Sequence, residues 1–250
     1  MSNKTTTTAI ITGSTRGIGK ETAILLFSKM RANVVVCSRT QSEIDLVIKE
    51  IKKMSTSDGN IDDRQFDDRL LGIKCDVSKS IEVDHLIRST IDKFKSIDIL
   101  VNNAGIVFVK KLIDTSEEEW DKTLNINLKS AFLCTKVILP FMIRNRSGVI
   151  VNVSSGAGKT GFPDISAYCA SKFGMIGLTQ SLAWEVGNYN IRVMAICPGE
   201  VDTKMQQNVD QDYYVRNKHN MLKPKTVAEK IVEMILEERR YHNGQSVEIG

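Results

Sequence analysis

Short apolar runs alternate along the chain with longer segments in which apolar residues recur at the three- to four-residue spacing of an amphipathic helix. The short runs predict strands at residues 7–12, 33–38, 70–75, 97–102, 148–153, 191–197 and 246–249. The periodic segments predict helices at residues 17–30, 43–54, 78–95, 116–144, 167–186, 204–216 and 226–238. Strands as uniformly apolar as residues 34–37 (VVVC), separated by helices, are typical of a parallel sheet that is covered on both faces. The pattern therefore predicts an α/β fold with a doubly wound parallel sheet and helices on both faces.

Capping residues indicate where two of the predicted helices begin. Ser116 precedes three glutamates, the pattern of a capping box, and Ser78 is expected to cap the helix that runs to about Lys95. The chain contains no internal repeat and no interdomain linker, so we expect residues 1–250 to form a single domain. The Asp-rich segment 55–69 is expected to be a solvated surface insertion. A calcium loop is the alternative, although the aspartates lack the spacing of an EF-hand.

The composition narrows the class of protein. The 250 residues are 42% hydrophobic and 26% charged, which is ordinary for a globular protein. The net charge is only +4, and the lysines and arginines are interspersed with acidic residues rather than grouped in a basic block. This argues against a nucleic-acid partner, and no uninterrupted apolar run approaches the roughly 18–20 residues of a membrane span. The N-terminal residues lack a signal-peptide pattern, so we expect a cytoplasmic protein. The five cysteines lack metal-site spacing and are expected to be buried and reduced.

Ser155, Tyr168 and Lys172 lie where a predicted strand leads into a predicted helix. Tyr168 and Lys172 are four residues apart, on one helical face and within reach of a common ligand. A neighbouring ammonium group favours the phenolate, so Lys172 is expected to lower the pKa of Tyr168 from its usual value of about 10. With the Ser155 hydroxyl beside it, such a phenol suits acid–base chemistry between a carbonyl and an alcohol. Tyr-x-x-x-Lys alone is a weak pattern, and a catalytic thiol at Cys169 or Cys197 is a less favoured alternative.

A glycine-rich turn, TGSTRGIG at residues 12–19, follows the first predicted strand and opens the first predicted helix. Glycines let the backbone approach a phosphate, and a helix N-terminus supplies free N–H donors. The turn is not a P-loop, because Gly19 and Lys20 are followed by Glu21. It is expected to bind a dinucleotide, although a glycine turn can also serve only to pack a helix on a strand. The expected contacts are Gly13, Ser14, Thr15, Arg16, Gly17, Ile18 and Gly19.

Further motifs follow in order: NNAG at residues 102–105, Asn127, Ser155, Tyr168-x-x-x-Lys172 and Pro198-Gly199. Together with TGSTRGIG, this ordered set resembles the short-chain dehydrogenase/reductase family over essentially the whole chain. The nearest branch is that of the 3-oxoacyl-thioester reductases. The resemblance implies a Rossmann-type fold, a nicotinamide cofactor and a homo-tetramer or homo-dimer.

The resemblance also implies roles for single residues. Tyr168 would be the general acid in reduction, Lys172 would also hold the nicotinamide ribose, and Ser155 would orient the carbonyl. Asn127 would kink its helix and hold a proton-relay water. The remaining implied cofactor contacts are Asp76 and Val77 at the adenine, Asn103, Ala104 and Gly105 beside the adenosine ribose, and Pro198, Gly199, Val201 and Thr203 along the nicotinamide.

The end of the second predicted strand bears on the choice of cofactor. An enzyme that uses NAD usually has an Asp or Glu there to bind the free 2′-hydroxyl. This chain has Ser38 and Arg39, with Arg16 in the nearby turn. Two guanidinium groups and a hydroxyl suit a 2′-phosphate, so NADP(H) is favoured over NAD(H). Two solvated arginines are the alternative.

One departure from the family pattern concerns the end of the first helix. The family often has a glycine there, whereas this chain has Arg31 and Ala32. A left-handed cap is costly for arginine, so we expect this loop to be shaped differently.

The function expected from these features is that of an NADPH-dependent carbonyl reductase, reversible as an alcohol dehydrogenase, whose substrate is a 3-oxoacyl thioester on CoA or acyl carrier protein. Basic residues near an expected substrate lid at about residues 200–225 favour a phosphorylated or acidic carrier, unless they are ordinary solvated charges. They are Lys204, Arg216, Lys218, Lys223 and Lys225. The alternatives are a general ketone, aldehyde or quinone reductase, a non-catalytic NADP-binding redox sensor, and a structural oligomer subunit with vestigial activity.

Overall fold

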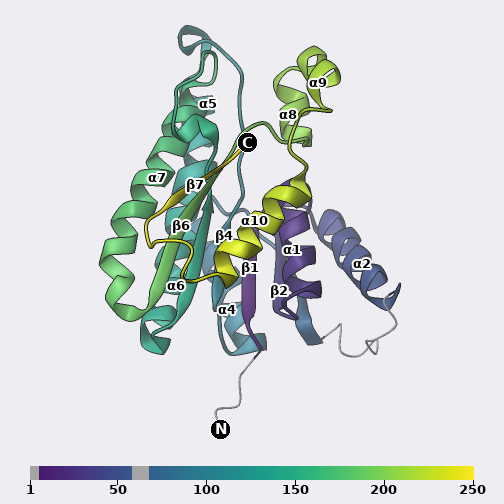
Figure 1. Ribbon diagram of the computed structural model, residues 1–250, viewed down its shortest axis with the longest axis vertical. Helices are drawn as coiled ribbons and strands as arrows, with labels where there is room; N and C mark the ends of the chain where they lie inside the picture. Colours follow the sequence, from purple (N-terminus) through teal and green to yellow (C-terminus); the bar gives the residue numbers. More distant parts are fainter. Residues whose placement is uncertain (1–5, 58–67) are drawn as a thin grey trace.

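The computed structural model describes residues 6–57 and 68–250, without the side chains of residues 55–57. The described residues form a seven-stranded parallel sheet with the strand order β3-β2-β1-β4-β5-β6-β7 (Figure 1). The strands are β1 (Thr8–Thr12), β2 (Asn33–Ser38), β3 (Leu70–Lys74), β4 (Ile99–Asn102), β5 (Gly148–Val153), β6 (Ile191–Pro198) and β7 (Ser246–Ile249). Because the strand order reverses between β1 and β4, the sheet is doubly wound, as the sequence predicts.

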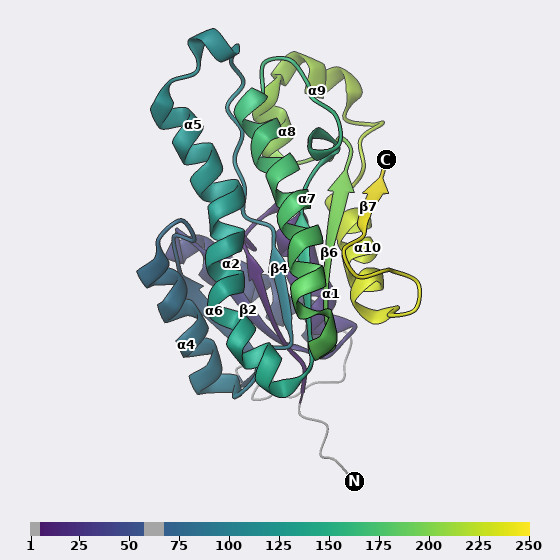
Figure 2. The ribbon, with the colours of Figure 1, turned by 90° about the vertical axis from the view of Figure 1, so that its left-hand side faces the viewer.

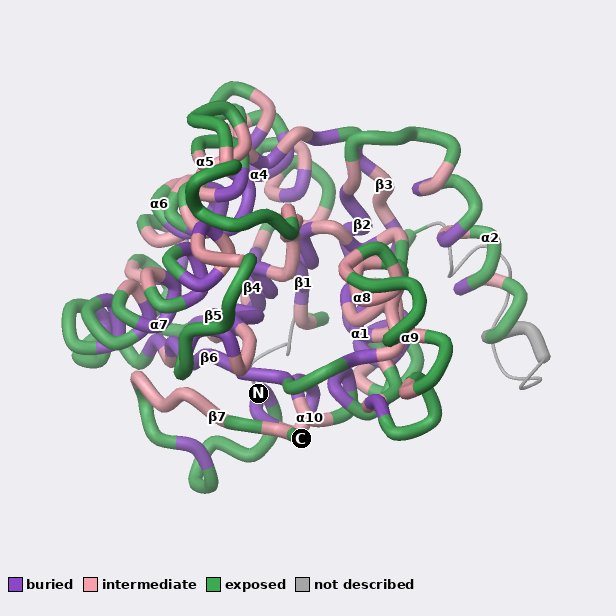
Figure 3. Tube along the Cα trace, turned by 90° about the horizontal axis from the view of Figure 1, so that it is seen from above, coloured by how far each residue is buried: buried purple, intermediate pink, exposed green. Residues whose placement is uncertain are grey.

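Helices cover both faces of this sheet. One face carries α1 (Gly17–Ser28), α2 (Gln41–Ser57) and α10 (Pro224–Leu236); in Figure 1, α10 crosses in front of the sheet and α1 and α2 lie to the right. The other face carries α4 (Ser80–Phe94), α6 (Ser130–Asn145) and α7 (Ser166–Val186), which face the viewer in Figure 2. The short helices α5 (Glu117–Leu124), α8 (Lys204–Val209) and α9 (Gln211–Asn217) extend beyond the carboxyl ends of the strands (Figures 1 and 3).

The strand β2 shows why uniformly apolar strands occur in this fold. Val34 and Val36 pack into the core on the α1 and α2 side, whereas Val35 and Cys37 pack into the core on the α4 and α6 side. All four side chains are fully buried. Because neighbouring residues of a strand point to opposite faces, a sheet covered on both sides needs apolar residues at every position. Each buried aliphatic side chain stabilises the fold by about 1.5–3 kcal/mol.

The helix starts confirm one prediction and correct another. Ser116 caps α5 with the full capping box, accepting from the backbone N–H of Glu119 while the Glu119 carboxylate accepts from the backbone N–H of Ser116. Ser78 does not cap α4, whose N-cap residue is Lys79. The Ser78 hydroxyl instead donates to Asp76 Oδ1 over 2.7 Å. The prediction failed because the same hydroxyl can close a local turn on a preceding carboxylate.

The turn after α1 and the segment after β6 also differ from the sequence-based prediction. Arg31 adopts the left-handed conformation (φ +53°) that the sequence analysis judged too costly for arginine. The turn is held by a hydrogen bond from the backbone N–H of Ala32 to the Leu26 carbonyl and by the complete burial of Ala32, which offset a cost of about 1–2 kcal/mol. The predicted helix at 204–216 is two helices, because Asp210 is extended and caps α9 by accepting from the backbone N–H of Tyr213. Most of the insertion at 55–69 lies outside the described residues.

The helical region Glu117–Asn145 joins α5 and α6 through a π-helical turn, Asn125–Lys129. Among the described residues it is the one helix whose length and composition would allow it to cross a membrane, but half of its apolar window is buried within the protein. Ala131, Cys134, Ile138 and Met142 are fully buried on its inner face. Its apolar character therefore follows from packing against the sheet.

Candidate active site

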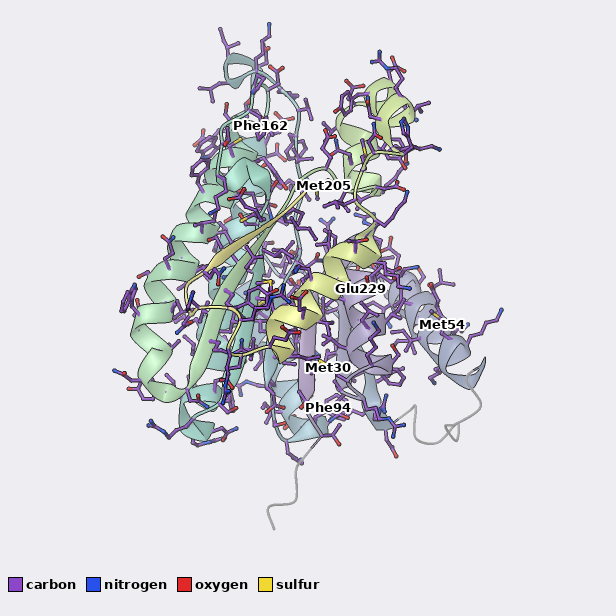
Figure 4. The ribbon with its side chains drawn as sticks, viewed as in Figure 1. Met30, Met54, Phe94, Phe162, Met205 and Glu229 are labelled. Atoms are coloured by element: carbon purple, nitrogen blue, oxygen red, sulfur yellow. The ribbon has the colours of Figure 1, made fainter. Side chains whose placement is uncertain are left out.

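A cavity of about 690 Å³ opens at the carboxyl ends of the strands. It lies beside the point where the strand order reverses, which is where doubly wound sheets hold their ligands. All of the predicted site residues line it except Ser14, Gly19 and Asn127. Phe162, ahead of α7, and Met205, at the start of α8, lie on opposite sides of this opening (Figure 4).

Ser155, Tyr168 and Lys172 come together at one end of the cavity. The Ser155 hydroxyl lies beside the Tyr168 phenol and acts to lower its pKa, and Ser155 Oγ accepts from the backbone N–H of Ala157 over 3.1 Å. Lys172 Nζ lies 5.5 Å from the centre of the Tyr168 ring and donates to the Val153 carbonyl over 2.7 Å. Strand β5 ends just before Ser155, and α7 carries both Tyr168 and Lys172 on one face. The helical spacing and the strand end thus bring the three side chains to a single place.

The electrostatics of this group differ from the sequence-based expectation. Burial raises the pKa of Tyr168, and the neighbouring Ser155 hydroxyl only partly opposes that effect. Lys172 is almost completely buried, and desolvation lowers its own pKa to about 8. Because its ammonium group is directed at the Val153 carbonyl rather than at the phenol, the predicted lowering of the Tyr168 pKa by Lys172 is wrong for this structure. A protonated phenol at neutral pH is the form that can donate a proton.

Asn127 lies within the π-helical turn, one layer behind the cavity wall. Its Oδ1 accepts from the backbone N–H of Ile106 over 2.8 Å, and its Nδ2 donates to the Ile106 carbonyl and to Ser171 Oγ. These contacts tie the helix to the loop after β4 and to α7. The side chain is fully buried and its hydrogen-bonding groups are occupied. It therefore fixes the position of the loop and of α7 relative to each other.

The glycine turn occupies the other side of the cavity. Gly13 and Gly17 have φ angles of +64° and +56°, and a Cβ at Gly13 would lie 3.1 Å from the Ala104 backbone. The Ser14 hydroxyl points away from the cavity and accepts from the backbone N–H of Cys37 over 2.9 Å. Gly19 is buried beneath the turn, against the Asn103 side chain. These residues therefore shape the turn, whereas its other members face the cavity.

Thr12 supports the turn from below, a role that the sequence analysis did not assign. Its hydroxyl accepts from the backbone N–H groups of Asn103 and Ala104, over 2.9 and 3.0 Å. The Asn103 amide in turn donates to the carbonyls of Thr12 and Gly13. The glycine turn and the NNAG segment are thus one hydrogen-bonded unit. Only the position of Thr12, directly before the first glycine, could have signalled this.

Charged residues gather where the adenosine end of a dinucleotide would lie. Arg16 and Arg39 are exposed and line the cavity together with Ser38 and Asp76. Burial would raise the pKa of Asp76, but the hydrogen bonds from Ser78 and the charge of Arg39 outweigh it and lower that pKa. Glu43, which the sequence analysis did not single out, also lines this end.

The five cysteines are free and buried, as expected. Burial raises the pKa of Cys197, which disfavours the thiolate that a nucleophile needs. Cys169 Sγ accepts from the backbone N–H of Phe162 over 3.4 Å, so this thiol holds the loop ahead of α7. No group of His, Cys, Asp and Glu among the described residues could hold a metal ion.

The cavity fits a dinucleotide. Gly13 and Gly17 line the cavity with backbone alone, and the N-cap residue of α1, Arg16, makes no side-chain capping bond. The first N–H groups of α1 therefore remain available to a phosphate. A Ser–Tyr–Lys group on a doubly wound sheet, facing such a turn across one cavity, defines a nucleotide-dependent oxidoreductase of the Rossmann class.

Comparison with known proteins identifies the family within this class. Residues 7–214 match the family model described as short chain dehydrogenase, so the chain belongs to the short-chain dehydrogenase/reductase family. It is 34% identical over 249 residues to a 3-oxoacyl-acyl-carrier-protein reductase from Thermotoga maritima, covering 96% of this chain and 94% of that protein. It is 35% identical over 212 residues to a reductase of the same name from Synechocystis sp., covering 85% and 81%.

The fold has close structural counterparts as well. A crystal structure of levodione reductase superposes with a TM-score of 0.85 at 26% identity, covering 97% of this chain and 95% of that one. A short-chain type dehydrogenase/reductase from Mycobacterium marinum superposes with the same score and identity. The chain is therefore an oxidoreductase of this family with a Rossmann-type fold, as the sequence motifs indicate.

Proposed function

We propose that the protein is an NADPH-dependent carbonyl reductase that converts a 3-oxoacyl thioester to the 3-hydroxyacyl thioester. The observation that carries this proposal is the group of Ser155, Tyr168 and Lys172 at one end of a cavity, facing an open glycine turn. The similarity to 3-oxoacyl-acyl-carrier-protein reductases over nearly the whole chain supports the substrate class.

The three side chains have distinct parts in this proposal. When bound, the nicotinamide supplies the hydride to the carbonyl carbon. Ser155 donates a hydrogen bond that positions the carbonyl oxygen and stabilises its developing charge. Tyr168 transfers its phenolic proton to that oxygen, and its raised pKa keeps the proton in place at neutral pH. Lys172 holds the ribose hydroxyls, and Asn127 keeps the loop after β4 and α7 in register.

The proposed cofactor is NADP(H). Arg16 and Arg39 line the adenosine end of the cavity, and guanidinium groups bind a phosphate bidentately. Asp76 and Val77 would contact the adenine. Asn103, Ala104 and Gly105 would lie beside the adenosine ribose, and the segment from Pro198 to Thr203 along the nicotinamide.

The opposite end of the cavity suits an acyl chain. Apolar side chains from the loops after β4 and β5 and from α8 line it, namely Ile106, Val109, Phe162, Ile165, Met205 and Val209. We propose residues 200–225 as the lid over this end. Its base is held by backbone hydrogen bonds of Leu222 with Glu200 and Asp202, by the Tyr214 hydroxyl donating to Asp202, and by a 2.9 Å ion pair between Lys223 and Asp202.

The sequence analysis predicts that basic residues near the lid attract a phosphorylated or acidic acyl carrier, and the structure leaves fewer of these residues free to do so. Lys223 is paired with Asp202, and Lys204 donates to Gln207. Arg216, Lys218 and Lys225 remain as the basic residues of the rim that would attract a phosphorylated carrier.

The proposal extends to assembly and location. Exposed aromatic residues on α6 and α7 (Phe132, Phe173 and Trp184, the last 89% exposed) support a homo-dimer or homo-tetramer through these helices. The five cysteines, which form no disulfide among the described residues, agree with a cytoplasmic protein.

The substrate proposal is tested by comparing acetoacetyl-CoA with ethyl acetoacetate in an NADPH oxidation assay. We expect acetoacetyl-CoA to have the higher kcat/KM, and added salt to weaken its use while leaving the ester almost unchanged, because only the carrier bears phosphates. Equal use of both, without a salt effect, would reject carrier recognition and leave a general carbonyl reductase. Binding of NADPH without turnover of any ketone, aldehyde or quinone would instead favour the redox-sensor alternative.

A further inference from the structure

An acidic side chain stands among the residues expected to bind the 2′-phosphate. Glu43 lies in the first turn of α2 and lines the same cavity as Arg16 and Arg39. Its Oε2 accepts from Thr15 Oγ1 over 3.0 Å and from Ser38 Oγ over 3.3 Å. Thr15 belongs to the glycine turn and Ser38 ends β2, so three separate segments meet on one carboxylate oxygen.

This arrangement changes what the two hydroxyls can offer a ligand. A hydroxyl has a single proton, so a Ser38 or Thr15 hydroxyl that donates to Glu43 cannot donate the same proton to a phosphate. An ionised carboxylate is an acceptor only. Within the described residues no hydrogen bond reaches Glu43 Oε1, which leaves that oxygen able to accept from a ribose hydroxyl.

The Glu43 carboxylate is also not paired with the arginines of the same cavity. No ion pair between described residues joins Glu43 to Arg16 or Arg39. Arg39 acts instead on Asp76, whose pKa it helps to lower. The adenosine end of the cavity thus presents two guanidinium groups and two carboxylates, and of the two carboxylates only Asp76 has its pKa lowered by Arg39.

We propose that Glu43 is a specificity-determining residue that limits the preference of this chain for NADP(H). Its carboxylate repels a 2′-phosphate and accepts a hydrogen bond from the free 2′-hydroxyl of NAD(H), so the chain accepts both cofactors with a graded preference. This inference rests on the proposed binding of a nicotinamide dinucleotide in the cavity. Two like charges a few ångströms apart in a solvated site change a binding constant by roughly five- to tenfold.

The test measures binding of two adenosine fragments to the full chain, so it needs neither turnover nor a known substrate. Isothermal titration at low salt gives the Kd of adenosine 2′,5′-bisphosphate and of AMP for the wild type and for Glu43→Gln. The amide keeps an acceptor for Thr15 and Ser38 while removing the charge. Asp45→Asn is the matched control, because it removes one charge from the exposed side of the same helix, outside the cavity.

We expect Glu43→Gln to tighten the bisphosphate by roughly five- to tenfold without tightening AMP, and the effect to shrink at high salt. Glu43→Ala should shift the ratio of the two constants in the same direction, and Asp45→Asn should leave it unchanged. An unchanged ratio in Glu43→Gln, or the same change in Asp45→Asn, would overturn the role of Glu43 while leaving the proposed function intact. If the wild type binds neither adenosine 2′,5′-bisphosphate nor AMP, both the role of Glu43 and the proposed function would be overturned.

Discussion

Replacing Lys172 with methionine should make the cofactor-free protein more stable at neutral pH, even though it removes a residue proposed for the active site. The Lys172 side chain is almost fully buried, and burial lowers its pKa from 10.5 to about 8. At pH 7 the group is charged in both the folded and the unfolded state, but the charge is disfavoured in the folded one. Methionine has a similar length and carries no charge, so it removes this cost.

The size of the effect follows from the two pKa values. A difference of 2.5 between the pKa values, at about 1.4 kcal/mol for each unit, corresponds to about 3 kcal/mol of destabilisation below pH 8. Methionine also loses the 2.7 Å hydrogen bond to the Val153 carbonyl, which is worth about 1 kcal/mol. The net gain expected for Lys172→Met at pH 7 is therefore about 2 kcal/mol.

The pH dependence provides the sharper test. Between pH 8 and 10.5 the unfolded state binds more protons at this site than the folded state, so wild-type stability rises with pH there. By pH 9.5 the cost of the buried charge should fall to about half, and the advantage of Lys172→Met should shrink with it.

Urea unfolding at a series of pH values from 6.5 to 9.5 measures this difference. Lys49→Met, on the exposed face of α2, controls for the loss of a lysine as such. A stability difference between wild type and Lys172→Met that does not change with pH would refute the reasoning. So would a variant that is less stable than the wild type at pH 7.

Two further predictions concern the cofactor end of the cavity. Arg39→Ala should raise the KM for NADPH by roughly ten- to a hundredfold and leave that for NADH almost unchanged, since a charge-assisted contact contributes about 1.5–3 kcal/mol; equal losses with both cofactors would remove Arg39 from the 2′ site. Gly13→Ala should lower stability by about 1–2 kcal/mol, because φ is +64° and the new Cβ would lie 3.1 Å from the Ala104 backbone. A thermal melt indistinguishable from wild type would contradict that geometry.

The fold could be predicted from the sequence because its strands are strongly apolar and its helices strongly periodic. A strand such as β2 packs against helices on both faces of the sheet, so consecutive residues must all be apolar, and this pattern is visible in the sequence. The wrong predictions at Ser78 and Arg31 arose where two local interactions or preferences compete. Ser78 had two possible partners, the first backbone N–H groups of α4 and the Asp76 carboxylate, and the sequence spacing is compatible with both. Arg31 adopts a costly conformation because packing of its neighbour Ala32 outweighs the local preference.

The site was predicted where its residues lie close together in sequence or form a motif, as Tyr168 and Lys172 do. Their electrostatics could not be predicted, because the pKa of a phenol depends on burial and on where a neighbouring ammonium group points. That direction is set by the Val153 carbonyl, a tertiary contact. Glu43 was missed for a related reason. Its proposed role depends on hydroxyls of Thr15 and Ser38, which are 28 and 5 residues away in the sequence.

The most direct test of the proposed carbonyl reductase is the reduction of acetoacetyl-CoA by NADPH with the wild type and with Tyr168→Phe. The substitution removes the phenolic hydroxyl, and with it the transferable proton, and leaves the ring on α7. The wild type should form 3-hydroxybutyryl-CoA in equal amount to the NADPH consumed. Tyr168→Phe should bind NADPH with the same Kd, while its kcat falls by about 10²- to 10⁴-fold. A kcat for Tyr168→Phe equal to that of the wild type, or no product from the wild type, would contradict the account.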